Sequence, residues 1–129
     1  MRRVFFSFAV ACLIAASAIA TLVAAPKAAE AGTITFYIKS SYPYSVDLAF
    51  YSQSRSHEWP GSGRVWILRD SKMRAYKLAC RRGERICYGA WVRGRIERYW
   101  GVGHGNNQRC AKCCWVCNNN ASQYITLRR

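Results

Sequence analysis

The chain has 129 residues, with 20 Lys and Arg against six Asp and Glu, and seven cysteines. This length accommodates one ordinary domain and excludes a large multidomain enzyme. The formal net charge of +14 indicates an anionic partner or a charged cellular surface.

The N-terminal segment has the three-part layout of a secretory signal peptide. A basic pair, Arg2-Arg3, precedes an apolar run over 4–25, and Ala29-Glu30-Ala31 places small residues where a signal peptidase cleaves. We therefore predict a signal peptide over 1–31 and a single disulfide-linked β domain over 32–129. The alternative is an uncleaved membrane anchor, because this apolar run is long enough to span a bilayer.

Removal of the leader changes the charge and the cysteine count. The remaining 98 residues would carry a formal charge of +12 and six cysteines, an even number. In a short exported chain, six cysteines predict a disulfide framework. We therefore expect a secreted or periplasmic protein.

Short segments of alternating apolar and polar residues follow one another after the leader, without sustained helical periodicity. We predict two hairpins, one between the first two strands and one between 75–80 and 85–92. The pattern predicts an all-β fold: a small antiparallel sandwich or open barrel of about seven strands, stapled by disulfides. The predicted strands are 33–39, 45–51, 65–68, 75–80, 85–92, 95–100 and 123–127.

Four cysteines lie within eight residues near the C-terminus, and two more lie on the predicted second hairpin. Zinc binding, assisted by His104, and a redox-active CxxC are alternatives to three structural disulfides. We favour disulfides, because export favours oxidation and the abutting CxxC pairs would have to reverse sharply to surround a metal. The six cysteines are Cys80, Cys87, Cys110, Cys113, Cys114 and Cys117.

Six cysteines allow 15 connectivities, among which the sequence does not select. One pairing is nevertheless expected: if Gly83 and Glu84 form the hairpin tip, Cys80 and Cys87 face each other across the ladder. The other four would then pair among themselves, but not as the adjacent Cys113–Cys114. We predict no metal and no cofactor.

An envelope hydrolase is an alternative function, with His57 assisting Glu58, Glu84 or Glu97 as paired carboxylates. The acidic residues are scattered over predicted strands and turns, and among so many cations we expect each to form an ion pair. We assign no catalytic residue, and the pattern favours a protein that is not an enzyme.

Arginines outnumber lysines after residue 31, and several stand close to aromatic residues. Arginine binds phosphate, sulfate and carboxylate bidentately and stacks on rings. We predict binding of an anionic polysaccharide, lipopolysaccharide or other polyanion, with peripheral membrane contact. Alternatives are a cationic membrane-active effector and a basic structural domain without a ligand. The predicted binding residues are Arg64, Trp66, Arg81, Arg82, Arg85, Trp91, Arg93, Arg95, Arg98 and Trp100.

Three segments carry a resemblance: GERICYGAW over 83–91, Tyr99-Trp100-Gly101, and the C-terminal cysteine cluster. They resemble small exported Cys-rich bacterial proteins with no assigned activity, over most of residues 33–117. This resemblance implies export and a cross-linked β domain, without a substrate. The first predicted hairpin is also slightly similar to the first strands of thaumatin-like sandwiches.

Overall fold

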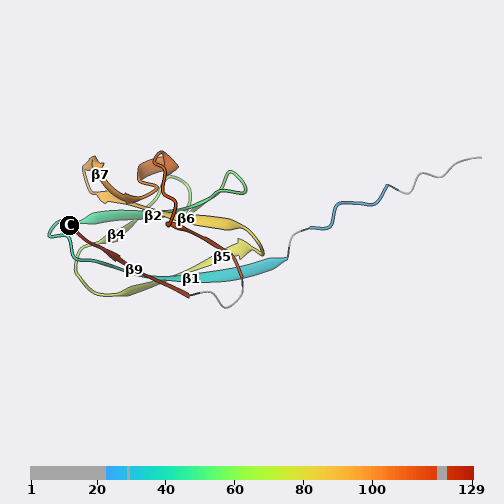
Figure 1. Ribbon diagram of the computed structural model, residues 1–129, viewed down its shortest axis with the longest axis horizontal. Coiled ribbons are helices and arrows are strands. Elements are labelled where there is room, and N and C mark those ends of the chain that lie inside the picture. Colours follow the sequence, from blue (N-terminus) through green and yellow to red (C-terminus); the bar gives the residue numbers. More distant parts are fainter. Residues whose placement is uncertain (1–22, 29, 119–121) are drawn as a thin grey trace, which may run out of the picture.

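Two β-sheets pack face to face (Figure 1). The structure is a computed structural model that describes residues 23–28, 30–118 and 122–129. Within these residues there is no α-helix, and a short 3₁₀ turn, η1, covers His104–Asn106. The predicted all-β sandwich is confirmed. The strands are β1 (Ala31–Ser40), β2 (Val46–Ser52), β3 (Glu58–Trp59), β4 (Trp66–Leu68), β5 (Arg74–Arg81), β6 (Arg85–Val92), β7 (Arg95–Gly101), β8 (Cys114–Val116) and β9 (Ser122–Leu127).

The strands are divided between two sheets, which we call sheet A and sheet B. Sheet A has the order β5-β1-β9, and sheet B has the order β3-β2-β6-β7, with β4 also paired to β2 and β8 to β6. The β1–β9 pair is parallel, and the other pairs of the described strands are antiparallel. The parallel pair departs from the purely antiparallel arrangement expected, because β9 enters sheet A from sheet B rather than through a hairpin.

Both predicted hairpins are wrong. β1 pairs with β5, which sets Ile34 opposite Leu78, and β2 pairs with β6, which sets Phe50 opposite Tyr88. The connections that follow β1 and β5 therefore carry the chain from one sheet to the other. An alternating pattern identifies a strand and its two faces, but it does not identify the strand's partner.

The faces predicted for the first two strands are nevertheless those observed. Phe36 of β1 and Phe50 of β2 are fully buried between the sheets, with ring centroids 4.6 Å apart. β2 is buried on both faces, because the segment 101–114 packs over the outer face of sheet B. Gly89 permits this approach, since a Cβ at that position would collide with the carbonyl oxygen of Gly103.

All six cysteines after residue 31 form disulfides, which are Cys80–Cys117, Cys87–Cys114 and Cys110–Cys113. The predicted Cys80–Cys87 bridge is wrong, because β5 and β6 belong to different sheets and do not form one ladder. The last four cysteines were predicted to pair among themselves, and this is correct only for Cys110–Cys113, because Cys114 and Cys117 bond to Cys87 and Cys80. Three intramolecular disulfides are typical of proteins in an oxidising compartment.

The predicted signal peptide falls mainly outside the described residues, which exclude 1–22 and 29. It therefore stays a prediction. At its expected end, Ala31 is the first residue of β1, and the carbonyl of Glu30 accepts a hydrogen bond from the Arg82 N–H. In the part of the chain that the structure describes, no helix has the length and apolar character needed to cross a membrane.

The three disulfides should differ in their effect on stability. Cys80–Cys117 joins residues 37 positions apart, whereas Cys110–Cys113 joins residues three positions apart. A longer closed loop removes more entropy from the unfolded chain. We therefore expect the free energy of unfolding to fall by about 4 kcal/mol on removal of Cys80–Cys117 and by about 2 kcal/mol on removal of Cys110–Cys113. Both losses can be measured by urea unfolding of two double variants, Cys80→Ala/Cys117→Ala and Cys110→Ala/Cys113→Ala. Equal losses would contradict this ranking.

Candidate polyanion-binding surface

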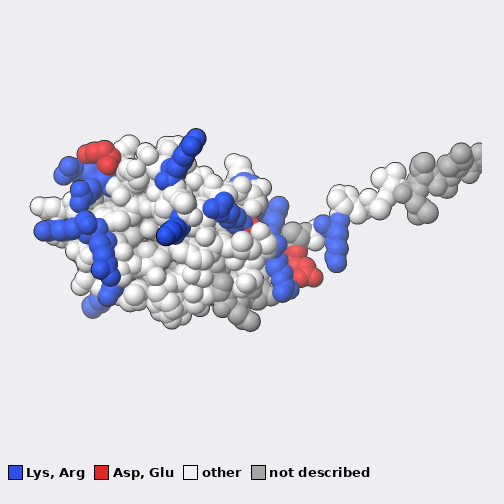
Figure 2. All heavy atoms as spheres, in the orientation of Figure 1, with Lys and Arg blue, Asp and Glu red and all other residues white. Residues whose placement is uncertain are grey.

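The arginines predicted to bind polyanions are divided between the two ends of β6. Arg81, Arg82 and Arg85 lie where the strand begins, whereas Arg93 and Arg95 follow its far end. A strand of this length extends about 24 Å, which is well beyond the Debye length of about 8 Å at physiological salt. Blue side chains gather at both ends of the molecule in Figure 2. The two groups of arginines are therefore electrostatically separate.

Three of these arginines have carboxylate partners, which reduce the positive charge that they offer to a ligand. The pairs join a guanidinium nitrogen to a carboxylate oxygen at 3.2 Å or less, and only the partner of Arg93 is largely buried. The guanidinium groups of Arg81, Arg85 and Arg98 have no carboxylate within 4.0 Å among the described residues. The pairs are Arg82–Glu30, Arg93–Asp47 and Arg95–Glu97.

Two of the three predicted tryptophans contribute to packing. Trp66 is half-buried and packs against Phe50 and Tyr76 of the core, with ring centroids 5.8 and 5.1 Å away. Trp91 is 4% exposed, and its ring lies edge-on to His104 at 4.8 Å. The Trp91 ring therefore presents no face on which a sugar or base could stack, whereas Trp66 also lines an open cleft beside Met73 and Arg74.

A further group of cations lies on the outer face of sheet A. The strands β1, β5 and β9 contain no acidic residue. Their register sets Arg81 of β5 opposite Ala31 of β1, and Lys77 of β5 opposite Thr35 of β1. Lys39 lies on β1 itself, so a cation occurs beside or on every fourth residue of this strand. That spacing is about 13 Å. No carboxylate of the described residues lies within 4.0 Å of these three side chains.

Two tyrosines stand between the last two of these cations. Tyr37 of β1 and Tyr124 of β9 are in register, and their rings stack with centroids 4.7 Å apart and planes 8° apart. Tyr124 is 72% exposed, so one side of the stack is open to solvent. We call this group the sheet A face; it consists of Arg81, Lys77, Tyr37, Tyr124 and Lys39.

The far end of the sheet A face continues into a cleft between β7 and β9. Arg128 directly follows β9, and its carbonyl accepts a hydrogen bond of 2.6 Å from Nε1 of Trp100. The guanidinium of Arg98 lies 5.5 Å from the ring centroid of Tyr42, which contacts Trp100 edge-on at 5.4 Å. This β7–β9 cleft has a volume of about 480 Å³ and is lined by Glu97, Arg98, Tyr99, Trp100, Thr126, Arg128 and Arg129.

The sequence analysis named Arg98 and Trp100, and Arg81 of the sheet A face, but it missed the other four residues of that face. The signal was present in the sequence, because Tyr37 and Lys39 occupy the polar positions of the first predicted strand. What could not be seen was the pairing, which brings Lys77 and Tyr124 onto the same face from distant parts of the chain.

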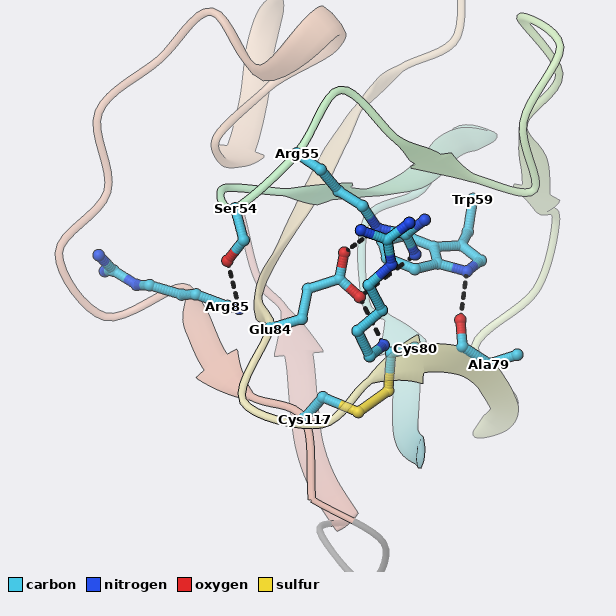
Figure 3. Close-up of a disulfide and its surroundings, with 9 residues drawn as sticks. Ser54, Arg55, Trp59, Ala79, Cys80, Glu84, Arg85 and Cys117 are labelled. Atoms are coloured by element: carbon cyan, nitrogen blue, oxygen red, sulfur yellow. Dashed lines mark hydrogen bonds and ion pairs between the residues drawn. A yellow bond between two sulfur atoms is a disulfide. The ribbon is translucent and has the colours of Figure 1, made fainter. Parts of the chain in front are cut away.

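Glu84 determines the local structure at the opposite end of the molecule (Figure 3). Its side chain is 1% exposed, and its carboxylate accepts hydrogen bonds from Arg55 and from the Arg81 N–H. Burial by itself raises the pKa of Glu84, but the hydrogen bonds from Arg55, Arg81 and Ser52 outweigh it and lower the pKa to about 2. The Arg85 side chain points away from this carboxylate in Figure 3.

The residues considered for hydrolysis are spread over three places. His57 and Glu58 line an open cleft of about 710 Å³ beside Arg55. Glu84 is buried, and Glu97 is exposed on β7 beside Arg95. That cleft is therefore lined by only one of the three carboxylates. No group of three His, Cys, Asp or Glu suited to a metal ion occurs in the described part of the chain.

Comparison of this chain with protein-family models, with curated proteins and with solved structures finds no match in any of the three.

Glu84 should make the fold sensitive to acid. The pKa is lowered from 4.5 to about 2 in the folded protein, so its stabilisation is complete above about pH 5 and is lost as the pH falls from 4.5 towards 2. The shift corresponds to about 3 kcal/mol. Urea unfolding between pH 7 and pH 2.5 should show this loss, and Glu84→Gln should be less stable at pH 7 and should lose most of the pH dependence.

Asp70→Asn provides a matched control, because Asp70 is an exposed carboxylate paired with Arg74. It should retain the acid sensitivity of the parent protein. If Glu84→Gln loses stability in acid as steeply as the parent, the role assigned to Glu84 is wrong.

Proposed function

We propose that this protein binds an extended anionic polymer along the sheet A face and into the β7–β9 cleft. The observation that carries the proposal is the alignment of Arg81, Lys77 and Lys39 on a solvent-facing sheet whose three strands contain no acidic residue. Arg98 and Arg128 extend the same run of positive charge at its far end.

A linear polyanion fits this arrangement better than a small anion does. Cations about 13 Å apart are too distant to hold one phosphate or sulfate together, but they can each bind a different group of a repeating chain. Release of condensed counterions would then supply much of the affinity. The exposed ring of Tyr124 and the half-buried ring of Trp100 offer apolar surfaces for sugar rings between the charged groups.

The expected ligand is an anionic polysaccharide or the carbohydrate part of lipopolysaccharide. The three disulfides support a secreted or periplasmic location, in which such polymers occur. The signal peptide over 1–31 belongs to this proposal. An envelope hydrolase and a membrane-active effector remain the alternatives.

Substitution of three cations on the sheet A face should weaken binding to heparin. The variant Lys39→Gln/Lys77→Gln/Arg81→Gln should elute from immobilised heparin at lower salt, and the slope of log K against log salt should decrease by about 2 to 3. The matched control removes three exposed cations from loops outside the face, Arg69→Gln/Lys72→Gln/Lys112→Gln. It has the same net charge and should elute close to the parent protein.

Two results would overturn the proposal. One is elution of the parent protein at the salt expected for a neutral protein, and the other is an equal shift in both triple variants. Anionic vesicles containing a trapped dye separate the membrane-active alternative: binding without leakage supports a polymer-binding role, whereas leakage favours the effector.

A further inference from the structure

The Cys110–Cys113 disulfide joins residues only three positions apart, whereas the other two join residues 27 and 37 positions apart. Cys110 is half-exposed and lines an open cleft of about 480 Å³, which Cys114 of the Cys87–Cys114 bridge also lines with a half-exposed side chain, whereas Cys80, Cys87 and Cys117 are each at most 6% exposed. Arg85 and Arg109 line the same cleft together with uncharged residues, and no acidic residue lines it. The chain also contains no Asp or Glu after Glu97. The Cys110 end of this disulfide is therefore open to solvent in a positively charged environment.

The segment that carries this disulfide is held in place by other interactions. The Gly105 N–H donates to the Tyr51 hydroxyl at 3.0 Å, and the side-chain amides of Gln53 and Asn106 exchange two hydrogen bonds. The carbonyl of Cys113 accepts a hydrogen bond from the backbone of β6. Opening the Cys110–Cys113 bridge would leave all of these contacts, and both other disulfides, in place. The bridge is therefore not needed to position its own segment.

We propose that Cys110–Cys113 is a thiol–disulfide exchange site for small thiols that carry carboxylates. The incoming thiolate attacks Sγ of Cys110, because Cys113 is 5% exposed. A new S–S bond joins the thiol to Cys110, the Cys110–Cys113 bond breaks, and its electron pair leaves on Cys113 as a thiolate. A second thiolate then attacks the mixed disulfide, which releases the oxidised thiol as its own disulfide and leaves both cysteines reduced. Arg85 and Arg109 would bind the carboxylates and attract the anionic thiol.

The first experiment treats the folded, fully disulfide-bonded protein with glutathione, a tripeptide thiol with two carboxylates. Samples are quenched with acid and mapped by mass spectrometry. We expect the first mixed disulfide at Cys110. Cys114 lines the same cleft, so modification of Cys114 first, or of all three bridges at equal rates, would overturn the assignment.

The second experiment tests the role of the two arginines. At equal thiolate concentration, glutathione should react faster than cationic cysteamine, and added salt should reduce the difference. The variant Arg85→Gln/Arg109→Gln should react with glutathione roughly tenfold more slowly, with little change towards neutral 2-mercaptoethanol. The control Arg98→Gln/Arg128→Gln has the same net charge and should behave as the parent protein.

The salt dependence of the parent protein tests the same interaction without any substitution. If glutathione and cysteamine react equally fast with the parent, or if the two double variants slow glutathione equally, the proposed site is wrong. Loss of heparin binding in the sheet A variants would not affect either experiment, because those residues lie outside this cleft.

Discussion

The fold depends on the point at which the C-terminal part of the chain passes from sheet B to sheet A. β8 is paired to β6 in sheet B, β9 is paired to β1 in sheet A, and Cys117 lies between them, bonded to Cys80 of β5. The N–H of Cys117 donates to the Glu84 carbonyl at 2.7 Å, and its own carbonyl accepts from Gly83 at 2.9 Å. A disulfide and two hydrogen bonds thus fix the crossing. Because parallel pairing of β9 with β1 joins residues distant in sequence, its loop-closure entropy is large, and this fixed point reduces it.

The proposed binding surface depends on the same crossing. β9 contributes Tyr124 to the stack on the sheet A face, and the chain after it contributes Arg128 to the β7–β9 cleft. Without β9, Tyr37 would stand alone on β1 and Trp100 would lose the carbonyl to which it donates. Loss of the Cys80–Cys117 bridge is therefore expected to affect the binding surface through the position of β9, although neither cysteine is part of that surface.

Local patterns in the sequence predicted the strands well and their partners poorly. The alternation over 33–39 placed Phe36 in the core correctly, because side chains of a strand alternate between its faces whatever its partner is. The partner depends on whether a short connection turns within one sheet or crosses to the other, and the residues of these connections allow both. For the same reason the Cys80–Cys87 bridge was wrong, while the participation of all six cysteines in disulfides was right. Arg98 and Trp100 were predicted from their closeness in the sequence, and the structure places both in one cleft. Trp91 was misjudged because a distant loop covers it.

The distribution of the few acidic residues explains why the excess positive charge is concentrated on particular surfaces. Five of the six form ion pairs with arginine, and Glu58 instead accepts a hydrogen bond from the Gly63 N–H. Two of the five, Asp47 and Glu84, are buried and connect separate parts of the chain. Since breaking such a pair leaves an uncompensated buried charge, these carboxylates are needed where they are. The sheet A face and the cleft beside Cys110 contain none of the six, so their cations are free to attract an external anion.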